Sequence, residues 1–196
     1  MGDFFLYLIA MATVQNIVLS TGIGASVMLR MSRQPKDIPL YCGFLCGFSV
    51  VDLLLVYPIR RYLLPKDFIT NLISPAVVVR VVIFVYLLVV AILKRAVPRV
   101  LSRIQRILSL AAFNNVLIGL LMITEFSLNT SLWGALGAAV GAALGFFLLS
   151  RLIDEALSRL DNPEMPAAFK GFPIALLYLG LLALAFSGFK PAITLF

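Results

Sequence analysis

The chain contains no histidine, only two cysteines and few charged residues. Without histidine there is no imidazole to bind a metal or to act as a general base near neutral pH. The cysteines, Cys42 and Cys46, lie one helical turn apart and are half of the four thiolates that an iron–sulfur cluster normally needs, so we expect them to pack as small apolar side chains. Zinc-binding and P-loop spacings are also missing.

Apolar residues dominate what is present. They make up 62% of 196 residues, charged residues make up 13%, and the mean hydropathy is +1.06. A helix that crosses a bilayer needs about 20 mostly apolar residues. Six such stretches predict an all-α integral membrane protein with one membrane domain, residues 1–196. The first stretch lacks the features of a cleaved signal peptide. The predicted spans are about 4–29, 39–58, 72–93, 107–125, 131–150 and 172–189.

The sequence repeats itself weakly at an offset of 98 residues, half its length. Asn16 recurs as Asn114 and Pro75 as Pro173. These matches are informative, because the position of an asparagine or a proline in a membrane helix is constrained by hydrogen bonding or by the backbone. With three spans per half, the second copy must enter the membrane from the opposite side. We therefore predict two inverted three-helix repeats, 1–98 and 99–196. The other matched pairs are Val18/Val116, Leu19/Leu117, Gly43/Gly141, Gly47/Gly145 and Phe48/Phe146.

Lysine and arginine are unevenly distributed over the connections. Those after the first, third and fifth predicted spans hold eleven basic residues, whereas the other connections and the termini hold four. The positive-inside rule places the richer connections in the cytoplasm and both termini outside a prokaryotic-type inner membrane, which the chain crosses several times. Topology and contact with the lipid bilayer then account for the net charge of +7, and no nucleic-acid partner is expected.

The first and fourth predicted spans carry polar residues and glycine where the hydrocarbon centre should be. Asn16 leads into Ser20 in the first, and Asn114 and Asn115 adjoin in the fourth. Backbone groups freed by a helix break at that depth must be satisfied by protein or by a lined cavity. We predict that both helices are discontinuous and meet near the midplane, where these residues form a polar or ion site. The alternative is a pair of continuous helices whose polar side chains bond to each other.

Small residues line the second and fifth predicted spans. Gly43 and Gly47 are four residues apart, and Gly137, Gly141 and Gly145 repeat that spacing. Such stripes let helix backbones approach closely. We expect contacts within the chain; the alternative is contact with a partner subunit.

Two charged residues lie inside the predicted spans and away from their end residues, Asp52 late in the second and Arg80 in the first half of the third. An isolated central charge costs at least about 3 kcal/mol, so both should face protein or water. We expect a static ion pair between them. The alternatives are a role in an ion or proton pathway and extension of each side chain to the membrane surface.

The turn at 165–171, MPAAFKG, and the stretch at 184–189, LAFSGF, are the most specific motifs of the chain. With residues 14–19 and 114–119, they resemble the RnfA and NqrE subunits of the Rnf and Na+-pumping NADH:quinone reductase complexes. The resemblance runs nearly end to end. It implies six spans, inverted repeats and outward termini, a homologous sister membrane subunit with further complex subunits as partners, and translocation of Na+ or H+.

In that family a cysteine from each discontinuous helix, with two from the sister subunit, holds a [2Fe–2S] cluster. The matching positions here are Ser26 and Asn115, and a hydroxyl or an amide is a poor replacement for thiolate at iron. An acidic residue expected near the end of the third span is replaced by Val90. The resemblance thus implies a retained scaffold, with no cluster or other cofactor bound by this chain alone.

Two functions remain open from the sequence. The first is a non-catalytic membrane subunit of an Rnf- or Nqr-like ion-translocating electron transport complex, with a structural or ion-conducting role. The second is a small secondary transporter or channel that reuses the inverted-repeat scaffold, with the midplane polar residues as its site.

Overall fold

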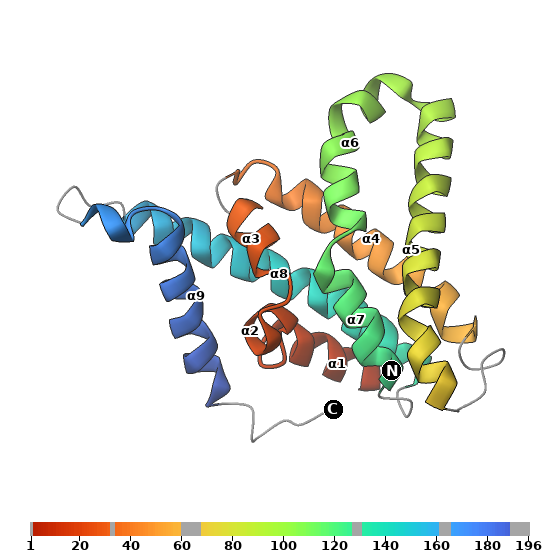
Figure 1. The fold of residues 1–196 in the computed structure, drawn as a ribbon, viewed down its shortest axis with the longest axis horizontal. Coiled ribbons are helices and arrows are strands. Elements are labelled where there is room, and N and C mark those ends of the chain that lie inside the picture. The colour runs from red at the N-terminus through yellow and green to blue at the C-terminus, as the bar shows by residue number, and fades with distance from the viewer. Residues whose placement is uncertain (1, 32–33, 60–67, 127–130, 161–165, 189–196) are drawn as a thin grey trace.

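The computed structural model describes residues 2–31, 34–59, 68–126, 131–160 and 166–188. Within these ranges the chain is helical and contains no strand, which confirms the predicted all-α class (Figure 1). The elements are α1 (Gly2–Ala12), α2 (Ile17–Thr21), α3 (Ala25–Met31), α4 (Ile38–Pro58), α5 (Phe68–Ala96), α6 (Pro98–Ala112), α7 (Asn115–Phe126), α8 (Leu132–Leu160), the short 3-10 helix η2 (Ala167–Phe169) and α9 (Phe172–Ser187).

Among the described residues, four helical stretches are long and apolar enough to cross a membrane: Ile38–Pro58, Ile73–Ala96, Pro98–Ile123 and Leu132–Arg159. The apolar helices α1 and α9 have 11 and 16 residues. At about 1.5 Å per residue they are shorter than the roughly 30 Å hydrocarbon core of a bilayer. The architecture is that of a multi-pass membrane protein.

Helix interruptions occur where the sequence predicts them. The first predicted span consists of α1, α2 and α3, and the fourth is broken between α6 and α7. Gly22 ends α2 in the left-handed conformation, with φ of 72°, and its N–H donates to the carbonyl oxygen of Val18. Glycine adopts this conformation without a steric penalty, so the break is encoded locally.

The long helix α8 packs against α1, α4, α7 and α9 (Figure 1). Its glycines face α1: a Cβ atom built on Gly137 would lie 2.2 Å from the carbonyl oxygen of Phe4, and one on Gly141 would lie 2.4 Å from that of Leu8. The prediction of contacts within the chain is confirmed for α8. It is wrong for α4, because Gly43 and Gly47 are exposed and a Cβ on either meets nothing within 4 Å.

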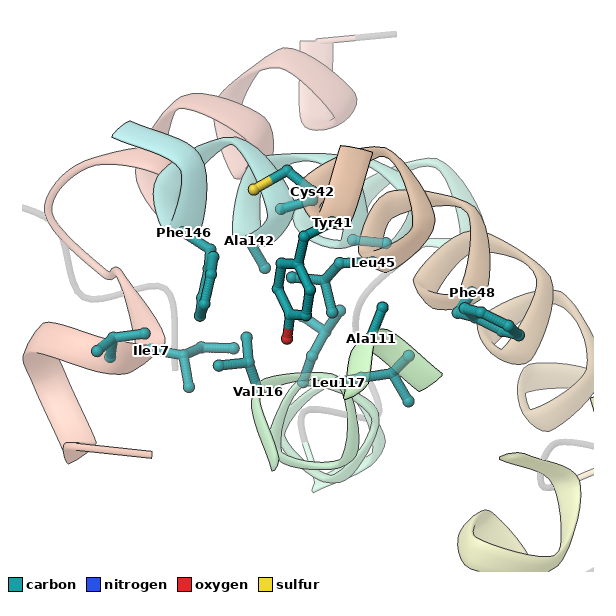
Figure 2. Packing of buried hydrophobic residues seen from close by; sticks show 14 of the residues in the cluster. Ile17, Tyr41, Cys42, Leu45, Phe48, Ala111, Val116, Leu117, Ala142 and Phe146 are labelled. Atoms are coloured by element: carbon teal, nitrogen blue, oxygen red, sulfur yellow. The ribbon is translucent and has the colours of Figure 1, made fainter. Parts of the chain in front are cut away.

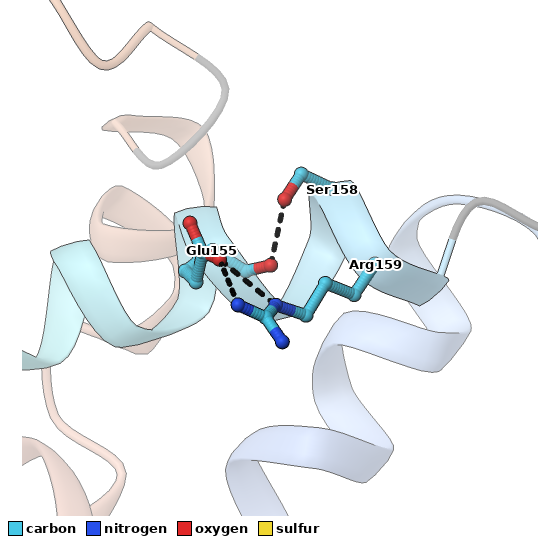
Figure 3. Close-up of polar contacts among 3 residues, drawn as sticks. All are labelled: Glu155, Ser158 and Arg159. Atoms are coloured by element: carbon cyan, nitrogen blue, oxygen red, sulfur yellow. Dashed lines mark hydrogen bonds and ion pairs between the residues drawn. The ribbon is translucent and has the colours of Figure 1, made fainter.

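Charged residues gather near the C-terminal end of α8, beyond its glycine stripe. Arg159 Nε donates to Glu155 Oε1 at 2.8 Å, and Ser158 Oγ donates to the Glu155 carbonyl oxygen at 2.7 Å (Figure 3). Both partners of this ion pair are largely exposed, so it adds little to stability. This end of α8 is therefore charged and exposed, in contrast to the glycine stripe.

Candidate functional site

Asn16 and Asn114, 98 residues apart, make the same hydrogen bond. Asn16 Oδ1 accepts the backbone N–H of Val18 at 3.0 Å, and Asn114 Oδ1 accepts that of Val116 at 2.9 Å. Each asparagine is buried and directly precedes a helix that starts after a break. Water does not reach a buried helix start, so the side chain of the asparagine supplies the hydrogen bond that the first backbone N–H groups of the helix need.

The two breaks lie against each other. Gly24, with φ of 84°, is so close to the start of α7 that a Cβ atom would lie 2.2 Å from Val116 Cγ2 and 3.4 Å from Asn114 Oδ1. A Cβ on Gly119 would lie 3.4 Å from the side chain of Ile23. The predicted interruption of both helices and the contact between them are confirmed, and the alternative of continuous helices is wrong. The location of this contact near the membrane midplane and its role as a polar or ion site stay predictions. We call this contact of residues 22–26 with residues 114–119 the helix crossing.

Tyr41 of α4 holds the second break in place. Asn114 Nδ2 donates to the Tyr41 hydroxyl, which donates to the carbonyl oxygen of Leu110 at 3.4 Å. That carbonyl belongs to the last turn of α6, where the break removes the usual helical donor. The Tyr41 ring packs on Phe146 of α8 with centroids 5.3 Å apart, and its hydroxyl points toward α7 (Figure 2).

Tyr41 was not singled out from the sequence. A signal was available, since a tyrosine inside an apolar span needs a hydrogen-bond partner for its hydroxyl. The identity of that partner depends on how α4 packs against α6 and α7.

The first break packs against a glycine of α8, whereas the second break is held by a tyrosine of α4. A Cβ atom on Gly145 of α8 would lie 2.5 Å from Asn16 Nδ2 and 2.9 Å from the carbonyl oxygen of Met11. Gly145 therefore makes room for the Asn16 side chain. Ser20, a further predicted site residue, is half-buried and its Oγ donates to the carbonyl oxygen of Ile17 at 3.4 Å.

Ser26 and Asn115, the positions that correspond to the family's cluster ligands, border the crossing. Ser26 lies in the first turn of α3, two residues after Gly24, and Asn115 is the first residue of α7. Both are exposed, unlike the neighbouring Asn114. Asn115 thus presents a polar side chain on the protein surface inside the stretch 98–123, which is apolar enough to span a membrane.

The residues at the crossing do not fit a [2Fe–2S] cluster, because an exposed hydroxyl and an amide stand where thiolates are needed. Cys42 is buried on α4 beside Tyr41, and Figure 2 shows it on the other side of the cluster from Val116 and Leu117 of α7. Cys46 is half-buried. In the described parts of the chain, no three His, Cys, Asp or Glu side chains gather so as to hold a metal.

The predicted ion pair between Asp52 and Arg80 is wrong. Asp52 is fully buried and neither carboxylate oxygen has a hydrogen-bond partner among the described residues, whereas Arg80 is exposed. On α5 the buried stripe includes Val78 and Val82. Arg80 is two residues from Val78, about 200° around the helix, and therefore points away from α4. Asp52 does not reach the surface either.

Comparison with known proteins identifies the family. A family model described as "Rnf-Nqr subunit, membrane protein" matches residues 4–193. The chain is 28% identical to one subunit of the Na(+)-translocating ferredoxin:NAD(+) oxidoreductase complex of Acetobacterium woodii, over 90% of this chain and 91% of that protein.

Two further relatives are similar over a larger share of the chain. One subunit of the ion-translocating oxidoreductase complex of Syntrophotalea carbinolica is 30% identical, over 96% of this chain and 97% of that protein. The protein of the same name from Rhodobacter capsulatus is 29% identical over the same shares. Motifs, fold and similarity agree along nearly the whole chain, which therefore belongs to the Rnf-Nqr family of membrane subunits.

Proposed function

We propose that this chain is a non-catalytic membrane subunit of an ion-translocating oxidoreductase complex, and that its helix crossing docks a homologous sister subunit. The observation that carries the proposal is the exposure of Ser26 and Asn115 beside two broken helices. Polar side chains facing lipid are unfavourable, and hydrogen bonds to a neighbouring helix remove that cost. The names of the relatives support membership of such a complex.

The proposed topology has six spans arranged as two inverted repeats. In it, α1–α3 form one interrupted span and α6–α7 another, with α9 as the last. The equal capping bonds of Asn16 and Asn114 support an internal repeat. The distribution of basic residues over the connections supports an orientation with both termini outside the inner membrane. Reporter fusions at Lys36, Arg99 and Arg159 should all report the cytoplasm, and two reporting the opposite side would contradict this topology.

We further propose that electrons pass through other subunits, because the donor set at the crossing does not suit iron. The purified chain should contain no stoichiometric iron or acid-labile sulfide and should give no cluster signal in electron paramagnetic resonance. A Cys42→Ala, Cys46→Ala double variant is the control. If the wild-type chain bound iron and the double variant did not, the proposal would be wrong.

The docking proposal is tested by Asn115→Leu. This substitution removes an exposed polar group that makes none of the described capping bonds, so the chain should still insert and fold. Loss of hydrogen bonds worth about 0.6 to 2 kcal/mol each should weaken recovery of the complex from native membranes by about 3- to 30-fold. Ser158→Leu is the matched control, because it replaces another exposed polar side chain by Leu at the C-terminal end of α8. A fully functional monomer carrying Asn115→Leu would favour the alternative of a small transporter or channel.

A further inference from the structure

Asp52 lies on the buried face of α4. The residues one and two turns away on that face, Leu45, Ser49 and Val56, are also buried. Ser49 Oγ is occupied in donating to the Leu45 carbonyl oxygen at 2.7 Å. The Asp52 carboxyl is therefore held inside the membrane domain and not at its lipid-facing surface.

Neither Asp52 oxygen accepts a hydrogen bond or forms an ion pair with the described residues. On α5, the facing helix, Ser74 is likewise fully buried and its Oγ has no partner among them. Ser74 belongs to the same inward stripe as Val78. Asp52 is six residues before the end of α4 and Ser74 is six residues after the start of α5, and these two helix ends lie near each other (Figure 1). Two unpartnered polar groups thus share one part of the interior.

The charged groups on the helices around α4 lie elsewhere. Arg80 of α5 is exposed, and α6 carries Arg99, Arg103 and Arg106 on its exposed side. On α8, which runs opposite to α4 (Figure 1), Arg151 pairs with Asp154 in the helix's last third. The side chain of Glu125 on α7 is outside the described part of the chain. Among the described side chains, none with a positive charge is placed to neutralise Asp52.

An ionised carboxylate with no partner in an apolar interior is strongly disfavoured, and such a group becomes neutral by binding a cation. Hard metal cations need about six or more oxygen ligands. The described polar side chains in this region supply only the hydroxyls of Ser49 and Ser74 besides the carboxyl itself. A proton needs only one oxygen.

We infer that Asp52 is an intramembrane proton-binding site, in which the carboxylate takes up one proton to become a neutral acid and releases it as the carboxylate forms again. The inference uses residues of this chain alone and does not rest on docking of a sister subunit. Asp52 would thus carry one proton within the membrane domain. The helix crossing itself contains no titratable side chain that could do so.

The test is modification of the full-length protein in native membranes with dicyclohexylcarbodiimide, a lipid-soluble reagent that reacts with protonated carboxyls. The acid adds across the carbodiimide and rearranges to a stable N-acylurea, so one reagent molecule is added and nothing leaves. Peptide mapping by mass spectrometry should place the adduct on Asp52. The rate of labelling should fall about tenfold for each pH unit above the midpoint of the titration.

Asp52→Asn should lose the adduct, and Asp154→Asn, which alters a carboxyl outside the buried region, should keep it. If Asp52→Asn does not accumulate, mapping of the wild-type chain still locates the label. No adduct on Asp52 at about pH 5, or labelling independent of pH, would overturn the inference. Protection by Na+ but not by K+ at constant pH would also overturn it, in favour of a metal cation. None of these results depends on recovery of a complex.

Discussion

Replacement of Asn114 by Leu measures how much the hydrogen bonds at the second helix break stabilise the fold. The substitution removes the cap on the N–H of Val116 and the donor to the Tyr41 hydroxyl. Loss of a capping side chain costs about 1 kcal/mol, and a side-chain hydrogen bond between membrane helices contributes about 0.6 kcal/mol on average. Forcing a branched side chain into a fully buried site adds about 1 kcal/mol or more. We expect the free energy of unfolding to fall by about 2 to 3 kcal/mol.

The assay is reversible unfolding in mixed detergent micelles, followed by circular dichroism. Asn115→Leu is the matched control, since the adjacent asparagine is exposed and should change the free energy of unfolding by less than about 0.5 kcal/mol. A double-mutant cycle of Asn114→Ala with Tyr41→Phe should give a coupling energy of about 0.6 to 1.5 kcal/mol. Equal losses for the Leu variants of Asn114 and Asn115, or no coupling, would refute the assigned network.

Three other substitutions have expected outcomes in the same assay. Gly145→Ala brings a Cβ to 2.5 Å from a side-chain amide of the first break and should cost about 1 to 3 kcal/mol, whereas Gly47→Ala, 98 residues earlier in open space, should be neutral or slightly stabilising. Gly22→Ala and Gly24→Ala both place an alanine in the left-handed region, which should cost about 1 to 2 kcal/mol. Gly24→Ala also brings a Cβ to 2.2 Å from Val116 Cγ2, which should add about 1 to 3 kcal/mol. Equal costs for the two variants would contradict the close contact at the crossing. Asp52→Leu removes a buried carboxyl that has no partner among the described residues, and it should raise the free energy of unfolding by about 1 kcal/mol or more. A clear fall in the free energy of unfolding would contradict this expectation, because it would mean that the carboxyl makes a favourable interaction in the folded protein.

The sequence alone determines the features that depend on local chemistry. Apolar stretches separated by basic connections specify a membrane protein, because no soluble core can hold that many such residues. Asn16 and Asn114 mark the helix breaks, since an asparagine within an apolar span competes for backbone hydrogen bonds and caps the helix that follows. The motifs at 165–171 and 184–189, together with residues 14–19 and 114–119, predicted the family.

Tertiary structure decided which helix faces meet. The apolar residues of α5 surround the whole helix, so its sequence has no polar side to show that Ser74 points inward and Arg80 outward. The pairing of Asp52 with Arg80 was wrong for that reason. Gly47 and Gly145 occupy equivalent sequence positions, yet only Gly145 is covered, because the neighbours of α4 and α8 differ. The rotation of each helix about its axis is set by packing against several other helices at once, and one helix's sequence does not contain that information.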